Sequence, residues 1–198
     1  INAFTRDGIV SHFGAHYRPG DSTLVVVGGV TGEEIASKAE GLLGDWSGSD
    51  GPPESGPDIA DVAAQPTTIY LVDKPGAAQS VIRAGHVTVP RHHPDYYAMS
   101  MLNYVFGGQP TARLFMNLRQ DKGYSYGYYS SIGWLTGQSS ILAGGAVETA
   151  VTKESVIETL KEFADIRGER PVTNDEFEAA RDGMFRSFPA QFETQGQM

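Results

Sequence analysis

The sequence of 198 residues contains no cysteine, which excludes disulfide bonds, thiolate metal sites and a cysteine nucleophile. Basic residues are also scarce, with 15 Lys and Arg against 24 Asp and Glu and a net charge of -9. Nucleic-acid binding needs clustered cations, so no nucleic-acid partner is expected. No apolar run approaches the ~20 residues of a membrane-spanning helix. The N-terminus also lacks the charged start and apolar middle of a signal peptide.

The residues that are present have the composition of a packed domain. Apolar residues make up 40% and charged residues 20%, which is typical of globular rather than disordered chains. The length suits one large domain, or one domain with part of another. The chain begins with Ile1 and stops within a helical pattern, so we interpret it as a segment of a longer protein.

The first part of the chain, residues 1–46, has the pattern of a helix, a strand and a second helix. Thr5 is suited to cap the first helix at its N-terminus. Residues 23–27 form an uninterrupted apolar run rich in valine, which predicts a buried strand. Thr31 and Glu34 have the spacing of a capping box, which predicts that the second helix begins there.

Residues 47–66 have a different composition, in which Gly, Pro, Ser and acidic residues predominate. A segment of this kind cannot bury enough apolar surface to order itself. We interpret it as a linker between two structural units. The alternative is a long surface loop within one domain, but ordered loops of this length are uncommon.

The remainder, residues 67–198, is predicted to form pairs of strands and pairs of helices in alternation. The predicted strands cover residues 68–73, 79–89, 124–134 and 138–147. The predicted helices begin at Pro94, Thr111, Thr152 and Thr173, the last in a second capping box. Adjacent strands favour antiparallel pairing, so the predicted fold is α+β, a mostly antiparallel sheet with helices packed on one face.

With no cysteine in the chain, the histidines are the candidate zinc ligands, and their spacing argues against a metal site. His12 and His16 are four residues apart, but no glutamate lies between or beside them as a zinc-peptidase helix would need. His92 and His93 are adjacent and point to different sides, and His93 is a plausible cap for the helix at Pro94. No metal site is expected in this chain.

A second candidate site lies where the helix over residues 111–121 turns into a strand. Arg119 occupies the last helical turn, and Gly123 is suited to reverse the chain. Tyr126 then returns beside Arg119, on a strand face predicted to carry Tyr128 as well. A guanidinium and a phenol together would suit a peptide carbonyl or an oxyanion. The spacing alone favours the other interpretation, an arginine at a helix C-terminus beside half-buried strand tyrosines.

Several segments carry a shared pattern in the same order along the chain. They are residues 7–28, 72–80, 94–108, 112–115 and 118–126. Together they resemble the second, substrate-binding lobe of the inverted-zincin peptidases, the family of pitrilysin, insulin-degrading enzyme and mitochondrial processing peptidase. Ala112 stands where that pattern usually has serine, which we expect to affect local capping only.

The resemblance implies a division of labour between two lobes. One lobe of such enzymes carries a His-x-x-Glu-His zinc motif, which is absent here, and the other supplies an arginine and a tyrosine seven residues apart, as Arg119 and Tyr126 are. It implies that this chain is the substrate-binding, non-metal lobe of a zinc metalloendopeptidase. Alone it would be inactive, with no catalytic residue. Zinc would lie on a complementary lobe or subunit, and the substrate would be a peptide or an unfolded protein.

Two other functions fit the sequence less well. One is a non-catalytic scaffold or peptide-binding subunit of the same fold, which need not keep the pair of Arg119 and Tyr126. The other is a free-standing hydrolase, but the serines have no evident His and Asp partners. The compartment is left open, with a preference for the bacterial periplasm or cell envelope.

The resemblance further implies that residues 1–46 end a preceding lobe and that the lobe over residues 67–198 is truncated at its C-terminal end. Its sheet would then keep an open edge, and the strand over residues 23–27 would lack a sheet of its own. Unpaired edges attract other strands. We therefore expect residues 23–27 to dock on the second lobe, within one chain or by exchange between two chains in a homodimer.

Overall fold

A computed structural model describes residues 3–47, 60–63 and 65–197. The chain divides into two compact units. The first unit comprises Ile1–Asp58 and Pro189–Met198, and the second comprises Ile59–Phe188. Of the predicted linker, residues 48–59 and 64 lie outside the described residues.

The first unit consists of short helices joined by extended chain. Its elements are α1 (Arg6–His16), the 3-10 turn η1 (Pro19–Asp21), α2 (Gly32–Leu43) and the 3-10 turn η4 (Pro189–Phe192). Thr5 caps α1 as predicted, because its Oγ1 accepts a hydrogen bond of 3.1 Å from the backbone N–H of Gly8. The predicted capping box of Thr31 and Glu34 opens α2. Among the described residues of this unit, only Arg18 is buried.

The strand predicted over residues 23–27 does not form, and this prediction is wrong. The segment has no strand assignment, and its large side chains, Leu24 to Val27, are between 40% and 76% exposed. β-branched residues favour a strand only where a neighbouring strand and a packed face receive them. The described sheet of the second unit consists of β1 (Gln79–Thr88), β2 (Ser125–Gly133) and β3 (Ser139–Glu148), and docking of residues 23–27 stays a prediction.

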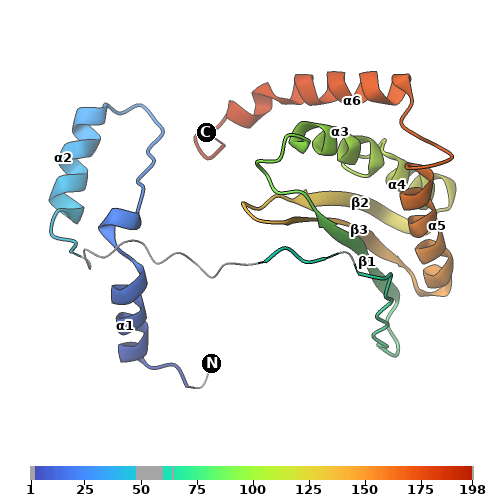
Figure 1. The fold of residues 1–198 in the computed structure, drawn as a ribbon, viewed down its shortest axis with the longest axis horizontal. Coiled ribbons are helices and arrows are strands. Elements are labelled where there is room, and N and C mark those ends of the chain that lie inside the picture. Colours follow the sequence, from blue (N-terminus) through green and yellow to red (C-terminus); the bar gives the residue numbers. More distant parts are fainter. Residues whose placement is uncertain (1–2, 48–59, 64, 198) are drawn as a thin grey trace. The chain divides into compact units, whose positions relative to one another are not determined.

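A three-stranded antiparallel sheet organises the second unit (Figure 1). Its strands are β1 (Gln79–Thr88), β2 (Ser125–Gly133) and β3 (Ser139–Glu148), in the spatial order β1-β3-β2. β2 and β3 form the predicted hairpin, and β1 pairs with β3 along its whole length, from Gln79 opposite Glu148 to Thr88 opposite Ser139. β1 and β2 are therefore the edge strands.

The strand predicted over residues 68–73 is absent, which is a second error. Its apolar residues, Ile69 to Val72, are between 73% and 88% exposed and belong to no strand. β-branched and aromatic residues favour a strand only where a neighbouring strand pairs with them, and none pairs with this segment among the described residues. The turn predicted after them does form, since Gly76 has a φ of 78° and Ala77 N–H donates to Lys74 O at 3.2 Å.

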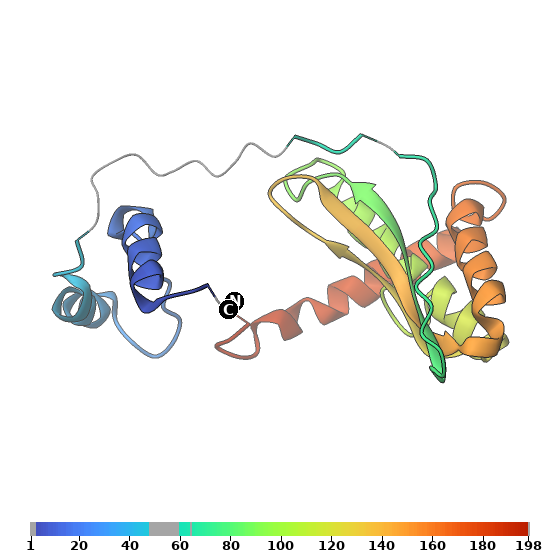
Figure 2. The ribbon, with the colours of Figure 1, turned by 90° about the horizontal axis from the view of Figure 1, so that it is seen from below.

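Helices cover one face of this sheet, which confirms the predicted α+β class (Figure 1 and Figure 2). They are α3 (Tyr96–Phe106), α4 (Arg113–Phe115), the π-helix η2 (Met116–Asp121), α5 (Thr152–Asp165) and α6 (Asn174–Ser187), with the 3-10 turn η3 (Thr149–Val151) before α5. α3 begins two residues after Pro94 rather than at it. His93 Nδ1 accepts from Asp95 N–H just before the helix, at 3.1 Å.

The hydrophobic core lies between the sheet and these helices. It comprises Ile82, Phe106, Leu114, Leu118, Tyr128, Ala143 and Val147. Leu118 from η2 and Tyr128 from β2 are fully buried. The Tyr128 hydroxyl keeps a partner in Thr159 Oγ1 at 2.7 Å, and burial raises the pKa of this phenol. This packing fixes η2 against β2, the two elements that carry the candidate site.

Candidate functional site

Arg119 lies in the π-helix η2 rather than in the regular helix predicted for this segment. The wide turn is closed by a bond of 3.0 Å from Lys122 N–H to Asn117 O, five residues back. Leu118 points into the core and is fully buried, whereas the neighbouring Arg119 is half-buried. π-helical turns are rare and often occur at functional sites. Here the turn anchors one residue in the core and leaves the next one at the surface.

Asn117 connects η2 to α5 by hydrogen bonds. Its Nδ2 donates to Glu162 Oε1 at 2.8 Å and to Glu158 Oε2 at 3.1 Å. Lys122 Nζ lies 3.4 Å from the other oxygen of Glu158. The bond from Asn117 lowers the pKa of Glu158, and the charge of Lys122 adds to this effect. α5 therefore supports η2, the element that carries Arg119.

The chain reverses at Gly123, as predicted. Gly123 has a φ of 69°, which residues with a side chain rarely adopt. Tyr124 N–H then donates to Leu118 O at 2.9 Å, so the turn is closed before β2 begins. This reversal returns the chain along η2.

A β-bulge follows, and it corrects the prediction that Tyr126 and Tyr128 share one face. Ser125 pairs with Val147 and Tyr128 with Gly145, so β2 contains one residue more than β3 over this stretch. The extra residue shifts the alternation of side chains. Tyr128 is consequently buried, whereas Tyr126 is 87% exposed.

Arg119 and Tyr126 come together at the surface, as their spacing predicted. The Arg119 guanidinium carbon lies 5.7 Å from the centroid of the Tyr126 ring, within the range of a cation–π contact. Both side chains carry hydrogen-bond donors, five N–H groups on the guanidinium and one phenolic O–H. Two such donors at one exposed point could hold a carbonyl oxygen or an oxyanion. A role in substrate binding stays a prediction.

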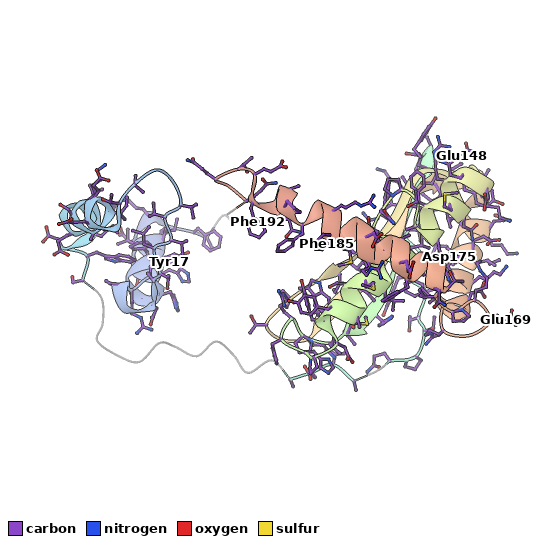
Figure 3. The ribbon with its side chains drawn as sticks, turned by 90° about the horizontal axis from the view of Figure 1, so that it is seen from above. Tyr17, Glu148, Glu169, Asp175, Phe185 and Phe192 are labelled. Carbon is purple, nitrogen blue, oxygen red and sulfur yellow. The ribbon has the colours of Figure 1, made fainter. Side chains whose placement is uncertain are left out.

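A second charged cluster, built on Arg113, was not singled out from the sequence. Arg113 is buried, and its guanidinium binds both carboxylate oxygens of Glu176 at 2.7 Å. It also donates to Pro171 O at 3.0 Å and to Arg170 O. The bonds from Arg113 lower the pKa of Glu176 to about 2. This clamp holds the start of α6, the end of the helix at which Asp175 is labelled in Figure 3.

The clamp was missed because its partners are more than fifty residues apart in the sequence. The one available signal was a lone arginine between Ala112 and Leu114, both of which are buried. A buried guanidinium requires a fixed acceptor set. Glu176 already had an expected role in the capping box, so its second role could not be inferred.

The described residues contain no group of three His, Cys, Asp or Glu side chains that could hold a metal ion. His12 and His16 do face each other on α1, with ring centroids 4.3 Å apart. None of the described helices is long and apolar enough to cross a lipid bilayer. The surface pair of Arg119 and Tyr126 is the candidate site.

Comparisons with solved structures show related folds. The peptidase M16 inactive domain from Pseudomonas fluorescens aligns over 93% of this chain and 44% of its own, with a TM-score of 0.75 and 19% identity. A protease from Helicobacter pylori aligns over 99% and 47%, with a TM-score of 0.79 and 19% identity. The periplasmic protease PqqL from Escherichia coli aligns over 86% and 19%, with a TM-score of 0.60 and 16% identity.

The chain spans less than half of the length of each of these three structures. No curated protein matches the sequence. A family profile described as "Peptidase M16 inactive domain" matches residues 3–184, which is nearly the whole chain. The chain therefore belongs to the family of peptidase M16 inactive domains.

Proposed function

We propose that this domain is the substrate-binding, non-metal lobe of a zinc metalloendopeptidase. The observation that carries the proposal is the contact of the half-buried Arg119 with the exposed Tyr126, with the guanidinium carbon 5.7 Å from the centroid of the phenol ring. A domain that served only to fill space would have no need of two donors held together at the surface. The family match supports the peptidase context but does not itself identify a substrate.

Both donors would act on the backbone of a bound peptide or unfolded protein. Arg119 would hold a carbonyl oxygen, and Tyr126 would donate to the oxyanion that develops as the peptide bond is attacked. The attacking water would be activated by zinc on a complementary lobe or subunit. This chain alone would hold no zinc and would be inactive.

The proposal is tested in the assembled enzyme, with the complementary zinc-bearing lobe present. Tyr126→Phe removes one O–H donor, so turnover of a peptide should fall by about 10²-fold. Tyr97→Phe is the matched control, because Tyr97 is also an exposed tyrosine but lies on α3. Arg119→Ala should raise KM as well as lower kcat. If both site variants keep wild-type kinetics, the domain is a non-catalytic scaffold or a peptide-binding subunit.

We also propose a homodimer formed by strand exchange, supported by the exposed apolar segment of residues 23–27 and by the edge strand β1. One chain would supply the segment and the other the edge. Sedimentation at increasing concentration should reveal a dimer, and Val25→Lys should abolish it. Val30→Lys, at an exposed position outside the segment, is the control. A monomer at all concentrations would refute the exchange.

For the compartment, we propose the bacterial periplasm or cell envelope. The support is one structural relative described as a periplasmic protease. Fractionation of cells that produce the native protein would test this, and recovery in the cytoplasmic fraction alone would contradict it.

A further inference from the structure

The loop between β2 and β3, residues 134–138, contacts a segment that lies far away in the sequence. Val62 N–H donates to Gln138 Oε1 at 2.8 Å, and Gln138 Nε2 donates to Val62 O at 3.2 Å. In an antiparallel sheet, two paired residues exchange bonds in this same way. The Gln138 amide therefore takes the place of a neighbouring strand and recognises backbone rather than a side chain.

The loop that presents Gln138 is itself held in place. Leu135 N–H donates to Ser139 Oγ at 3.0 Å, which closes the loop across its base. Arg91 N–H donates to Leu135 O at 2.9 Å and connects the loop to the chain that follows β1. A group on a fixed loop loses little conformational entropy when it binds, which favours a contact made by a single side chain.

A second hydrogen bond holds the chain that leads from Val62 to β1, at the opposite end of β3. Thr149 Oγ1 donates to Ala77 O at 3.0 Å. Gln138 directly precedes β3 and Thr149 directly follows it. Ten residues of strand span about 33 Å. The 14 residues between Val62 and Ala77 reach at most about 50 Å. A chain that can reach at most about 50 Å therefore has to span about 33 Å between its two anchors, so it is largely extended.

We propose that Gln138 is a docking site for the backbone of residues 60–63 and fixes where the connection toward the first unit leaves the second. With Val62 bound, the connection departs from the hairpin end of the sheet. Without it, the last anchor would be Ala77, beside the start of β1 and about 33 Å away. The inference does not depend on a role in peptide hydrolysis.

Hydrogen exchange of the Val62 amide in the full chain, followed by NMR, tests the contact directly. In Gln138→Ala this amide should exchange faster by on the order of 10-fold, the effect of a modest hydrogen bond. Gln138→Glu keeps an acceptor for the Val62 N–H but loses the donor to its carbonyl, so its effect should be intermediate. Thr136→Ala, in the same loop, is the control. Unchanged exchange in Gln138→Ala, or equal acceleration in Thr136→Ala, would overturn the proposal.

The exit point is tested with introduced thiols, because the chain has no cysteine of its own. Cysteines placed at Ala63 and Gly137 should be joined in high yield by a short bifunctional maleimide. Adding Gln138→Ala should lower the yield several-fold, and Val62→Pro should do the same because it removes the N–H donor. Val62→Ala should leave the yield unchanged. Equal yields in all these variants would show that Gln138 does not hold the segment.

Discussion

Two helices of this chain open with the same capping box, yet they differ in what surrounds them. In α2, Thr31 Oγ1 accepts from Glu34 N–H at 3.2 Å, and the Glu34 carboxylate accepts from Thr31 N–H at 3.0 Å. In α6, Thr173 and Glu176 make the same two bonds at 3.2 Å and 2.9 Å. α2 has no buried residue, whereas α6 buries Ala180 and packs on α3.

The difference lies in a partner from elsewhere in the chain. The pKa of Glu34 is lowered, chiefly by its hydrogen bond from the backbone of Thr31. The pKa of Glu176 falls further, to about 2, and the largest cause is the hydrogen bonding of Arg113. The local motif therefore determines where a helix begins, and a distant side chain determines whether that helix is fixed to a core.

The sharpest test of this comparison uses one leucine from each unit. Leu118 is fully buried, whereas Leu42 on α2 is 83% exposed. Leu118→Ala removes core volume and should destabilise the second unit by about 2–5 kcal/mol. Leu42→Ala removes a side chain that water already surrounds, so it should leave that transition unchanged. Chemical denaturation followed by the fluorescence of Trp134, in a Trp46→Phe background because Trp46 belongs to the first unit, measures both.

Breaking the clamp should have the next largest effect. Glu176→Ala leaves the Arg113 guanidinium buried without its carboxylate, which we expect to cost about 3 kcal/mol. Glu34→Ala breaks the equivalent box in α2 and should reduce helical circular dichroism without moving the midpoint of the second unit. If neither Glu176→Ala nor Glu34→Ala lowered the unfolding midpoint of the second unit, the bonds from Arg113 would not be what fixes α6 to the core.

The clamp also predicts how stability depends on pH. The pKa of Glu176 is lowered in the folded state from 4.5 to about 2. A lowered pKa means that the unfolded chain binds the proton more readily, so the contribution is complete above about pH 5 and is lost as pH falls toward about 2. Glu176→Gln should therefore flatten the acid limb of a plot of midpoint against pH. If Glu176→Gln left the acid limb unchanged, the loss of stability at low pH would come from other carboxylates.

The smallest expected effect concerns the cap itself. Thr173→Ala removes one capping oxygen and should destabilise the second unit by about 1 kcal/mol. Thr31→Ala removes the same oxygen from α2 and should not affect the second unit. Thr173→Ser retains the oxygen and should restore most of the loss. Thermal melts recorded on all three variants would show whether the two boxes differ as predicted.

The sequence contained most of the local structure of the second unit. The hairpin of β2 and β3, the turn at Gly123 and the box at Thr173 were all predicted, because each depends on neighbours in the sequence. The strands predicted at residues 23–27 and 68–73 were wrong. A short apolar run shows that a segment could pair, but the partner strand has to be supplied by the rest of the fold.

The candidate site was predicted in position but not in detail. The separation of Arg119 and Tyr126 indicated that they would meet, and they do. Neither the π-helical turn nor the bulge at Ser125 has a local sequence signal of comparable strength. Each inserts one residue into a regular element at an energetic cost. Packing of Leu118 in the core offsets this cost for the π-helical turn, and the hydrogen bonds of Ser125 offset it for the bulge.

The bulge in β2 reverses the alternation of side chains between the two faces of the sheet. Ser125 Oγ accepts from Gly127 N–H at 3.1 Å and lies 2.7 Å from Ala146 O, so one hydroxyl holds the extra residue in place. In a regular strand without the bulge, side chains two residues apart lie on the same face, so Tyr126 and Tyr128 would have the same environment. With the bulge, Tyr126 is exposed at the surface while Tyr128 is held in the core. The surface and the interior can therefore change independently within three residues of one strand.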